Sequence, residues 1–253
     1  MPSCIAAQLY TLREFLKTPS DIAATLQRVR AIGYEAVQLS GLGMIMPLDL
    51  KRILDAEGLR AVITHVSVDR LLRDFDALVE EHKLWQCPHV AIGSMPAEYR
   101  ATKEGYLTFA GIASEIAHKL QAHDLTFSYH NHSFEFARFD GKTGLEWFYD
   151  TADPLVLAEI DTYWVQHGGG DPADWCARMT HRMPVVHCKD MTILDGQQTM
   201  AEVGEGNLPW PRIIDACRQA GVQWYAVEQD ICHRDPFDSM AISLRNLHNM
   251  GLP

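Results

Sequence analysis

The sequence predicts one (β/α)8 barrel, formed as a single domain by residues 1–253. Helix-like segments alternate with short apolar strands, and the junction between them recurs as RAIGYEAVQL, DAEGLRAVITH, QAHDLTFSYH and RQAGVQWYAVEQ. This alternation is typical of a parallel sheet covered by helices, and eight strand–helix pairs in about 250 residues match a closed barrel. The glycine-rich turn that a doubly wound open sheet places after its first strand is missing, so the closed barrel is preferred.

The predicted strands are short apolar runs that end in polar residues. The first covers residues 4–9 and ends near Gln8 and Tyr10. The others are predicted at residues 34–41, 59–67, 89–96, 125–132, 155–164, 184–190 and 222–230. Turn-forming Gly, Pro or Asp residues bound most of these runs, as expected for strands that alternate with helices.

The predicted helices occupy the intervals between the strands. Ser20 or Asp21 caps the first helix, in which Ile22, Leu26 and later apolar residues recur at helical spacing until Gly33 ends it. Further helices are predicted near residues 47–57, 68–85, 104–123, 144–151, 171–179 and 236–250, with one more opening at residue 209. Residues 191–207 contain the turn-rich VGEGN segment and are predicted to form a long loop.

Charge and cysteine content oppose several classes of function. The net charge of −11 argues against nucleic acid or an anionic membrane as a partner. The six cysteines form no CxxC pair, which favours reduced thiols over a disulfide framework. The sequence shows no signal-peptide pattern, and no apolar run approaches the about 20 residues that span a bilayer. We therefore expect a cytoplasmic protein that acts on a small molecule.

Polar side chains mark the carboxyl ends of the predicted strands. The last four strands carry His130 and His132, then Asp161, then His187 and Lys189, then Glu228, while earlier strands carry Gln8, Gln38 and His65. Strand side chains two apart point the same way, and all carboxyl ends of a (β/α)8 barrel meet at one mouth, where its active sites lie. Converging imidazoles and carboxylates suit Mn²⁺, Zn²⁺, Fe²⁺ or Co²⁺.

Each of these residues also has a purely structural interpretation. A single strand histidine is usually a hydrogen-bonded structural residue, and Asp161 or Asp190 would suit a helix N-cap. Glu228 would suit an ordinary ion pair with Arg234. A functional site is favoured because all four successive strands would need such an explanation at once.

The alternation of side chains assigns directions within two of these strands. His187 and Lys189 point into the barrel together, so Cys188 faces the helices. Glu159 shares its direction with Asp161 and is either a hydrogen-bonded buried residue or one that orients a metal ligand.

Seven segments stand out between about residue 7 and residue 247: AQLYTLRE, AIGYEAVQLSG, YHNHSFEF, EIDTYWV, VHCKDM, VGEGNLPW and VEQD. Together they resemble the sugar phosphate isomerase/epimerase family of xylose isomerase-like TIM barrels. The same superfamily holds endonuclease IV, inosose dehydratase and the ketose 3-epimerases. The resemblance implies a divalent metal, with Mn²⁺ first and Zn²⁺, Co²⁺, Fe²⁺ or Mg²⁺ as alternatives. It also implies a homodimer.

The resemblance also implies roles for individual residues. Asp161, His187 and Glu228 match three metal ligands, and the fourth is either His130 or Glu135, because the family's strand-five glutamate is replaced by His130. Substrate contacts are expected from Gln8, His65, His132 and Lys189. Proton transfer and charge stabilisation are expected from His132, Glu135, Lys189 and Glu228.

The chemistry expected at such a site begins with an acidified C–H bond beside a metal-bound carbonyl. Reprotonation of the resulting enediolate gives an epimer or an isomer, and loss of a β-hydroxyl gives dehydration. We therefore expect an isomerase or epimerase of a keto- or aldo-sugar or a related polyol. The alternative is a lyase or hydratase of a keto-sugar or inosose, since YHNH is close to the YHHH of inosose dehydratases. A sugar-binding barrel without turnover and an endonuclease IV-like nuclease are less favoured, the nuclease because of the acidic net charge.

Overall fold

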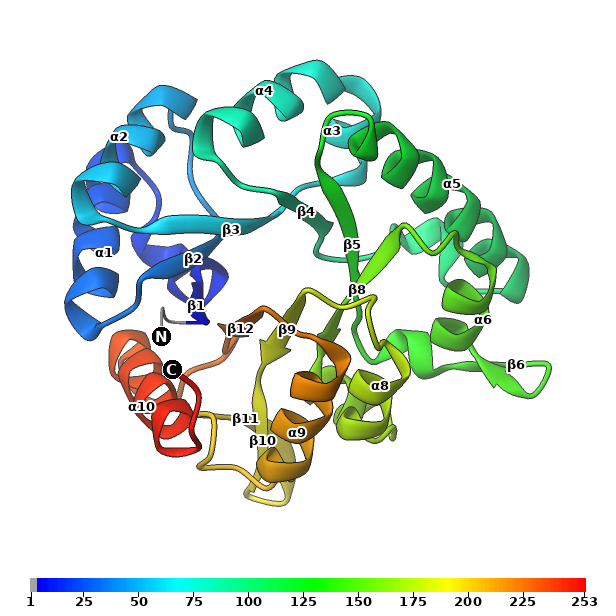
Figure 1. The fold of residues 1–253 in the computed structure, drawn as a ribbon. Coiled ribbons are helices and arrows are strands. Elements are labelled where there is room, and N and C mark those ends of the chain that lie inside the picture. The colour runs from blue at the N-terminus through cyan, green and yellow to red at the C-terminus, as the bar shows by residue number, and fades with distance from the viewer. Residues whose placement is uncertain (1–3) are drawn as a thin grey trace.

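The computed structural model describes residues 4–253 as a closed barrel of parallel strands surrounded by helices (Figure 1). The barrel strands are β1 Ile5–Gln8, β2 Ala36–Leu39, β3 Arg60–His65, β4 His89–Ile92, β5 Thr126–His130, β8 Val156–Asp161, β9 Val185–Cys188 and β12 Trp224–Val227. Each strand pairs with the next in this order, and β12 pairs with β1 to close the barrel. The predicted (β/α)8 fold is confirmed.

The helices form the outer layer of the barrel. They are α1 Pro19–Ile32, α2 Pro47–Glu57, α3 Val68–Arg73, α4 Phe75–Trp85, α5 Lys103–Gln121, α6 Gly144–Thr151, α7 Thr162–His167, α8 Pro172–Arg178, α9 Trp210–Ala220 and α10 Pro236–Asn249. Short 3-10 helices lie at η1 Leu9–Phe15, η2 Ala97–Tyr99 and η3 Phe134–Phe136. Among the described residues, every helix is too short or too polar to cross a membrane.

Two predicted helices and one predicted strand need corrected boundaries. Thr18, and neither Ser20 nor Asp21, caps α1, because Thr18 and Asp21 form a reciprocal capping box across the first turn. The segment 68–85 is two helices that break at Asp74. Helix α7 starts directly after Asp161, where the sequence pattern predicted a strand continuing to residue 164.

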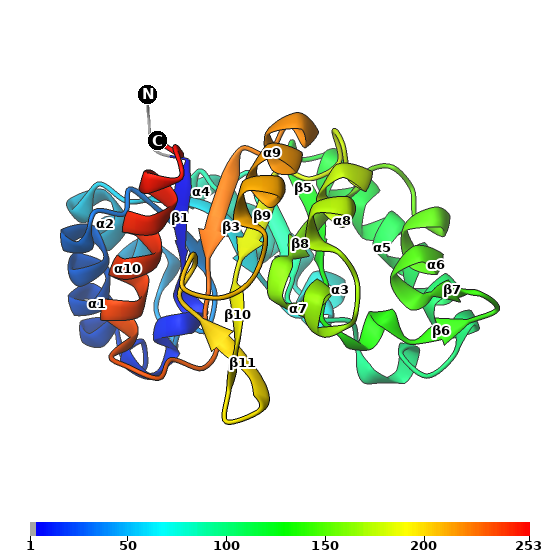
Figure 2. The same ribbon diagram turned by 90° about the horizontal axis from the view of Figure 1, so that it is seen from below.

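The segment predicted as a loop at residues 191–207 contains a β-hairpin. Strands β10 Asp190–Leu194 and β11 Gln197–Ala201 pair antiparallel around Asp195 and Gly196, whose φ angles are 50° and 76°. Asp-Gly is a preferred pair for such a two-residue turn. Figure 2 shows the hairpin projecting from the end of the barrel opposite the C-terminus. A second, shorter hairpin joins β6 Arg138–Phe139 to β7 Lys142–Thr143.

The interior of the barrel is divided into an apolar part and a polar part. The apolar part is built mainly from small side chains, Ala6, Ala36, Ala91 and Ala226, with Val62, Ile63 and Val185. Two residues further along, β1, β2, β3, β9 and β12 present Gln8, Gln38, His65, His187 and Glu228 instead. The larger apolar core lies between the strands and the helices. The barrel therefore concentrates its buried polar groups near the carboxyl ends of the strands.

Candidate metal centre

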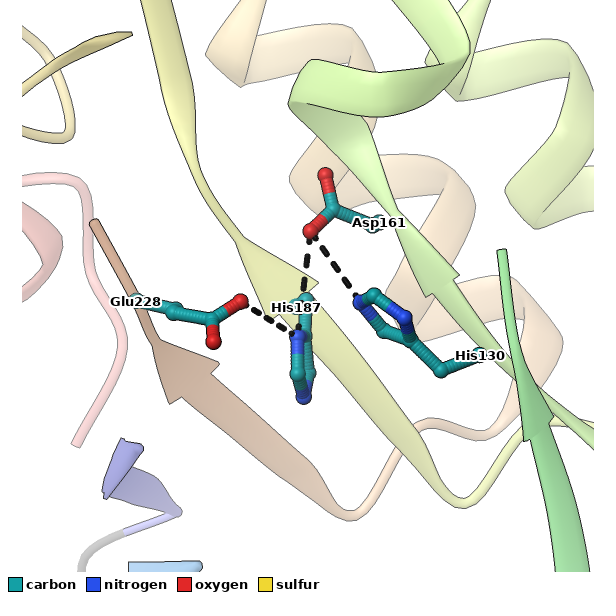
Figure 3. Close-up of side chains that lie close together, drawn as sticks. All are labelled: His130, Asp161, His187 and Glu228. Carbon is teal, nitrogen blue, oxygen red and sulfur yellow. Dashed lines mark hydrogen bonds and ion pairs between the residues drawn. The ribbon is translucent and has the colours of Figure 1, made fainter. Parts of the chain in front are cut away.

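Four residues from neighbouring barrel strands converge at the carboxyl end of the barrel (Figure 3). His130 ends β5, Asp161 ends β8, His187 lies in β9 and Glu228 follows β12. The strand register places Asp161 directly beside His187. One ligand atom from each of the four lies within 4.8 Å of the others, and all four side chains are buried.

The contacts within this cluster are between imidazole nitrogens and carboxylate oxygens. His130 Nε2 lies 3.3 Å from Asp161 Oδ2. His187 Nδ1 lies 3.1 Å from Glu228 Oε2 and 3.8 Å from Asp161 Oδ2. Two imidazole nitrogens and two carboxylate oxygens are a suitable donor set for a first-row divalent ion.

The hydrogen bonds outside the cluster determine which imidazole nitrogens face it. His130 Nδ1 donates to the carbonyl oxygen of Gly93 at 3.1 Å, because a carbonyl only accepts. In a neutral His130, Nε2 therefore carries a lone pair and no proton. His187 Nε2 contacts two acceptors, Gln38 Oε1 at 2.8 Å and Glu159 Oε1 at 3.0 Å, so the lone pair of neutral His187 is on Nδ1.

These tautomers point lone pairs at negative oxygens on both sides of the cluster. Nε2 of His130 faces Asp161, and Nδ1 of His187 faces Glu228, so each contact repels unless a cation lies between the two atoms. Protons fill this need in part, since burial lowers the pKa of His187 but the attraction of Glu159 and Glu228 outweighs it and raises that pKa well above the ordinary value. The residues therefore fit a divalent ion, and the orientation of both rings by outer hydrogen bonds is a usual feature of metal sites.

Glu159 lies beneath the cluster and is fully hydrogen-bonded. Gln38 Nε2 donates to its Oε1 at 2.9 Å, and His65 Nε2 contacts its Oε2 at 2.6 Å. Burial raises the pKa of Glu159, but His187 and His65 hold it well below the ordinary value. The interpretation of Glu159 as a hydrogen-bonded buried residue is confirmed, and its contact with His187 Nε2 places it to orient that ring.

Lys189 brings an ammonium group to the same oxygens. Its Nζ lies 3.0 Å from Asp161 Oδ2, 2.6 Å from Glu228 Oε2 and 2.8 Å from Asp230 Oδ2. Burial lowers the pKa of Lys189, but the three carboxylates outweigh it and raise the pKa well above that of a free lysine. Burial likewise raises the pKa of Asp161 and of Glu228, and Lys189 reverses both shifts, so that both pKa values are lowered. Lys189 is therefore protonated and both carboxyls are ionised at neutral pH.

A cavity of about 500 Å³ opens beside the cluster. Its walls include Tyr10, Arg13, His65, His130, His132, Trp164, Lys189, Met200, Glu228 and Asp230. Another cavity, of about 400 Å³, lies beside Trp175 and Arg178 and contains none of the clustered residues. Of the two, the cavity beside the cluster, called the mouth cavity below, is the one lined by residues of the cluster, His130 and Glu228.

The residues expected to contact substrate divide into two groups. His65, His132 and Lys189 line the mouth cavity. Gln8 is completely buried, lies outside that lining and accepts a hydrogen bond from the backbone N–H of Tyr10 at 3.0 Å, which caps η1. Its placement gives Gln8 a structural role.

His132 and Glu135 lie close in sequence but in different environments. The ring of His132 stacks on Phe134 and lies 5.2 Å from Trp164 between ring centroids, at the cavity wall. Burial, together with His130, lowers the pKa of His132 to about 3, so its ring is neutral at pH 7. Glu135 is absent from the cavity wall: its oxygens accept from the hydroxyl of Tyr129 at 2.6 Å and the N–H of His132 at 2.9 Å.

The N-cap interpretation holds for Asp161 but not for Asp190, which lies in β10, and the ion-pair interpretation of Glu228 is wrong. Asp161 Oδ1 does cap α7, accepting from the N–H of Trp164 at 2.8 Å, while Oδ2 faces the cluster. Asp190 accepts hydrogen bonds from backbone N–H groups of the following loop and from the Trp210 indole. Glu228 makes no ion pair with Arg234, which contacts Glu202 and Glu205 instead. Cys188 is buried among apolar residues between barrel and helices, as its alternation with His187 predicts.

Several residues of the cavity wall had no predicted site role, among them Arg13, Trp164, Met200 and Asp230. Asp230 had a usable signal, because it stands two residues after Glu228, the spacing that linked His187 to Lys189. Trp164 and Met200 had none, since α7 and the β10–β11 hairpin bring them to the cavity through tertiary structure.

No protein-family model matches this sequence, and no curated protein matches it at a significant level. Solved structures do match it. A sugar phosphate isomerase/epimerase from Parabacteroides distasonis has a TM-score of 0.85 and 21% identity, covering 100% of this chain and 96% of that chain. An L-ribulose 3-epimerase has a TM-score of 0.72 and 13% identity, covering 97% of this chain and 93% of that chain. The probable 3-DHS dehydratase AsbF from Bacillus anthracis has a TM-score of 0.72 and 14% identity, covering 97% and 98%. The chain therefore has the xylose isomerase-like TIM-barrel fold that its sequence predicts.

Proposed function

We propose that this protein is a divalent-metal-dependent enzyme that isomerises or epimerises a keto- or aldo-sugar or a related polyol. The observation that carries the proposal is the convergence of four buried side chains, His130, Asp161, His187 and Glu228, whose two imidazole nitrogens and two carboxylate oxygens lie within 4.8 Å of one another. Buried carboxylates need a positive partner, and a divalent ion shared by the two carboxylates and the two imidazoles would supply one. The cavity beside them has room for a small polar ligand.

The four clustered residues would hold the ion. When bound there, a divalent ion supplies Lewis acidity, which lowers the pKa of a C–H bond next to a carbonyl that it polarises. Lys189 contributes a positive charge at the cavity wall, suited to stabilising a negative substrate oxygen. This role requires no loss of its proton, in agreement with its raised pKa.

Two groups at the cavity wall are placed to move a proton. Glu228 is an ionised carboxylate, and neutral His132 offers a ring nitrogen. Glu135 is a weaker candidate than either, because both of its oxygens already accept hydrogen bonds away from the cavity. We therefore assign proton transfer to Glu228, with His132 as its partner at the cavity wall.

A lyase acting on a keto-sugar or inosose is the second candidate, and one observation favours it. The resemblance to ketose epimerases implies a pair of glutamates for acid–base work, yet β5 presents His130 where one of them would stand. Glu228 is thus the only glutamate among the four clustered residues. A single acid–base carboxylate beside histidines is compatible with removal of a proton followed by loss of a β-hydroxyl.

Isotope exchange distinguishes the two candidates. The metal-stripped protein is reloaded with Mn²⁺, Zn²⁺, Co²⁺ or Mg²⁺ and incubated in D₂O with a panel of aldoses, ketoses and inososes, and the products are analysed by mass spectrometry. Deuterium incorporation without loss of water supports the isomerase or epimerase. Loss of water supports the lyase. A metal-loaded protein that exchanges no proton in any member of the panel contradicts both.

A further inference from the structure

Lys189 makes a third contact that the proposed chemistry does not use. Its Nζ touches Asp230 Oδ2 at 2.8 Å as well as the carboxylates of Asp161 and Glu228. Asp230 is not one of the four clustered residues, and among residues 4–253 it belongs to no other group of side chains that could hold a metal ion. Its side chain is 24% exposed on the cavity wall, whereas those of Asp161 and Glu228 are buried.

The ammonium and a bound ion would compete for the same two atoms. The oxygens that contact Nζ are Asp161 Oδ2 and Glu228 Oε2, and these same oxygens face His130 Nε2 and His187 Nδ1. Any cation bound to both oxygens is adjacent to Nζ, because Nζ already touches both. Two cations on shared anions repel strongly in a buried site.

The number of carboxylates around Lys189 indicates which of its contacts remains once an ion binds. Three carboxylates, those of Asp161, Glu228 and Asp230, contact the single ammonium of Lys189, so an ion that binds the first two leaves the third. The other titratable side chains lining the cavity are Tyr10, Arg13, His65, His130 and His132, and none of them is a carboxylate. Among the described residues that contact Nζ, Asp230 is therefore the carboxylate left for Lys189 once the other two hold an ion.

We propose that Asp230 is a positioning residue for Lys189, which turns from Asp161 and Glu228 onto Asp230 alone when a divalent ion binds. In the metal-free protein the ammonium then compensates the two ligand carboxylates, and in the loaded protein Asp230 keeps it at the cavity wall for the substrate. This inference rests on the proposed metal-dependent function.

The surrounding contacts allow this movement and limit it to the side chain. The backbone of Lys189 is fixed by Thr162, whose hydroxyl contacts the Lys189 N at 3.0 Å and O at 2.8 Å. Asp230 is fixed through its N–H, 3.2 Å from Met200 Sδ, and through its carbonyl, which accepts from Arg13 Nη2 at 3.0 Å. The flexible four-carbon side chain of Lys189 can therefore change its contacts while its own backbone and Asp230 stay in place.

The test measures the binding of Mn²⁺ to metal-stripped protein by titration calorimetry. We expect Asp230→Asn to weaken binding at least tenfold in the parent protein, since the ammonium then lacks its second partner. In a Lys189→Met background the same substitution should weaken binding by a smaller factor. Asp238→Asn, which removes an exposed charge from α10, is the matched control and should change the dissociation constant less than threefold.

Three results would overturn the inference. One is that Asp230→Asn lowers Mn²⁺ affinity in the Lys189→Met background by as large a factor as in the parent, or a larger one. Asp230 would then act only through its charge. Another is no weakening by Asp230→Asn at all. The third is a crystal structure of the Mn²⁺-loaded parent in which Nζ still contacts Asp161 and Glu228, a readout that remains usable if Lys189→Met fails to fold. Absence of Mn²⁺, Zn²⁺ or Co²⁺ binding by the parent protein instead refutes the proposed function on which the inference rests.

Discussion

Substitution of Glu135 tests whether its carboxyl stabilises the fold or binds the metal. Its side chain is completely buried, and its oxygens accept from Tyr129 and from the backbone of His132. Burial raises its pKa from 4.5 to about 7, although these hydrogen bonds act in the opposite direction. The folded protein therefore holds a proton on Glu135 over a pH range in which the unfolded chain has released it.

The sign of the effect on stability follows from this difference. Because the pKa of this acid is raised on folding, its favourable contribution is complete below about pH 4.5 and is lost as the pH rises to about 7. A shift of about 2.5 units corresponds to about 3 kcal/mol of unfolding free energy. Glu135→Gln, an uncharged mimic of the protonated carboxyl, removes this dependence.

The assay is urea unfolding of the metal-stripped parent and of Glu135→Gln at about pH 4.5 and about pH 8. Taking the difference between the two proteins cancels the other groups that titrate. The parent should lose about 3 kcal/mol relative to the variant across this range. Mn²⁺ affinity of the variant should stay within about threefold of the parent. A variant that loses its metal would make Glu135 a ligand in place of His130, and a constant difference in stability would refute the raised pKa.

The remaining predictions concern the cluster and its strands. Asp161→Asn and Glu228→Gln should each lower Mn²⁺ occupancy after dialysis at least tenfold while the fold persists, and full occupancy in both would contradict the site. A chelator should lower the melting temperature of the metal-loaded parent, since an ion at 100 times its dissociation constant contributes about 2.7 kcal/mol to stability. An unchanged melting temperature would mean that metal binding does not stabilise the fold. Cys188→Ala should keep turnover within about tenfold of the parent, about 1.4 kcal/mol of barrier, because its side chain faces the helices. Lys189→Arg should retain more turnover than Lys189→Met, and His132→Ala should slow deuterium exchange into the substrate while keeping its metal. If both lysine variants lose turnover equally and His132→Ala exchanges deuterium at the parent rate, Lys189 is the base.

The strand residues of the site were predictable because the alternation of a strand is a local rule. His130, His187 and Lys189 lie within or just after strands whose limits the apolar runs define, and their directions follow from counting by two. Closure of the barrel then brings these strand ends together without further information from the sequence.

The rule fails where the chain leaves the strand. Glu135 lies five residues beyond His130, after a bend and within η3, so alternation no longer decides where it points. The structure turns it back toward Tyr129, a residue of β5 that faces the helices. Asp190 likewise depends on backbone N–H groups of Gly204, Gly206 and Leu208, a contact across a loop that no local pattern indicates.

The hairpin at β10 and β11 was missed for a different reason. The Asp195–Gly196 pair is a strong turn signal, and the residues around it, MTIL and QQTM, form two strands of matching length. The loop prediction for residues 191–207 depended on the later glycines of VGEGN and overlooked this turn signal. The hairpin matters for the site because its last strand supplies Met200, which lines the cavity and contacts the N–H of Asp230.

Asp161 shows why a structural and a functional interpretation of one residue need not compete. A carboxylate has two oxygens with separate lone pairs, and here Oδ1 accepts from the N–H of Trp164 while Oδ2 faces His130 and Lys189. The cap anchors the carboxylate, because rotation of the side chain would break the first turn of α7. The same helix carries Trp164 to the cavity wall. The N-cap interaction is therefore the means by which the barrel holds a charged oxygen at a fixed point in the cluster, and the capping pattern strengthens the assignment of Asp161 as a ligand.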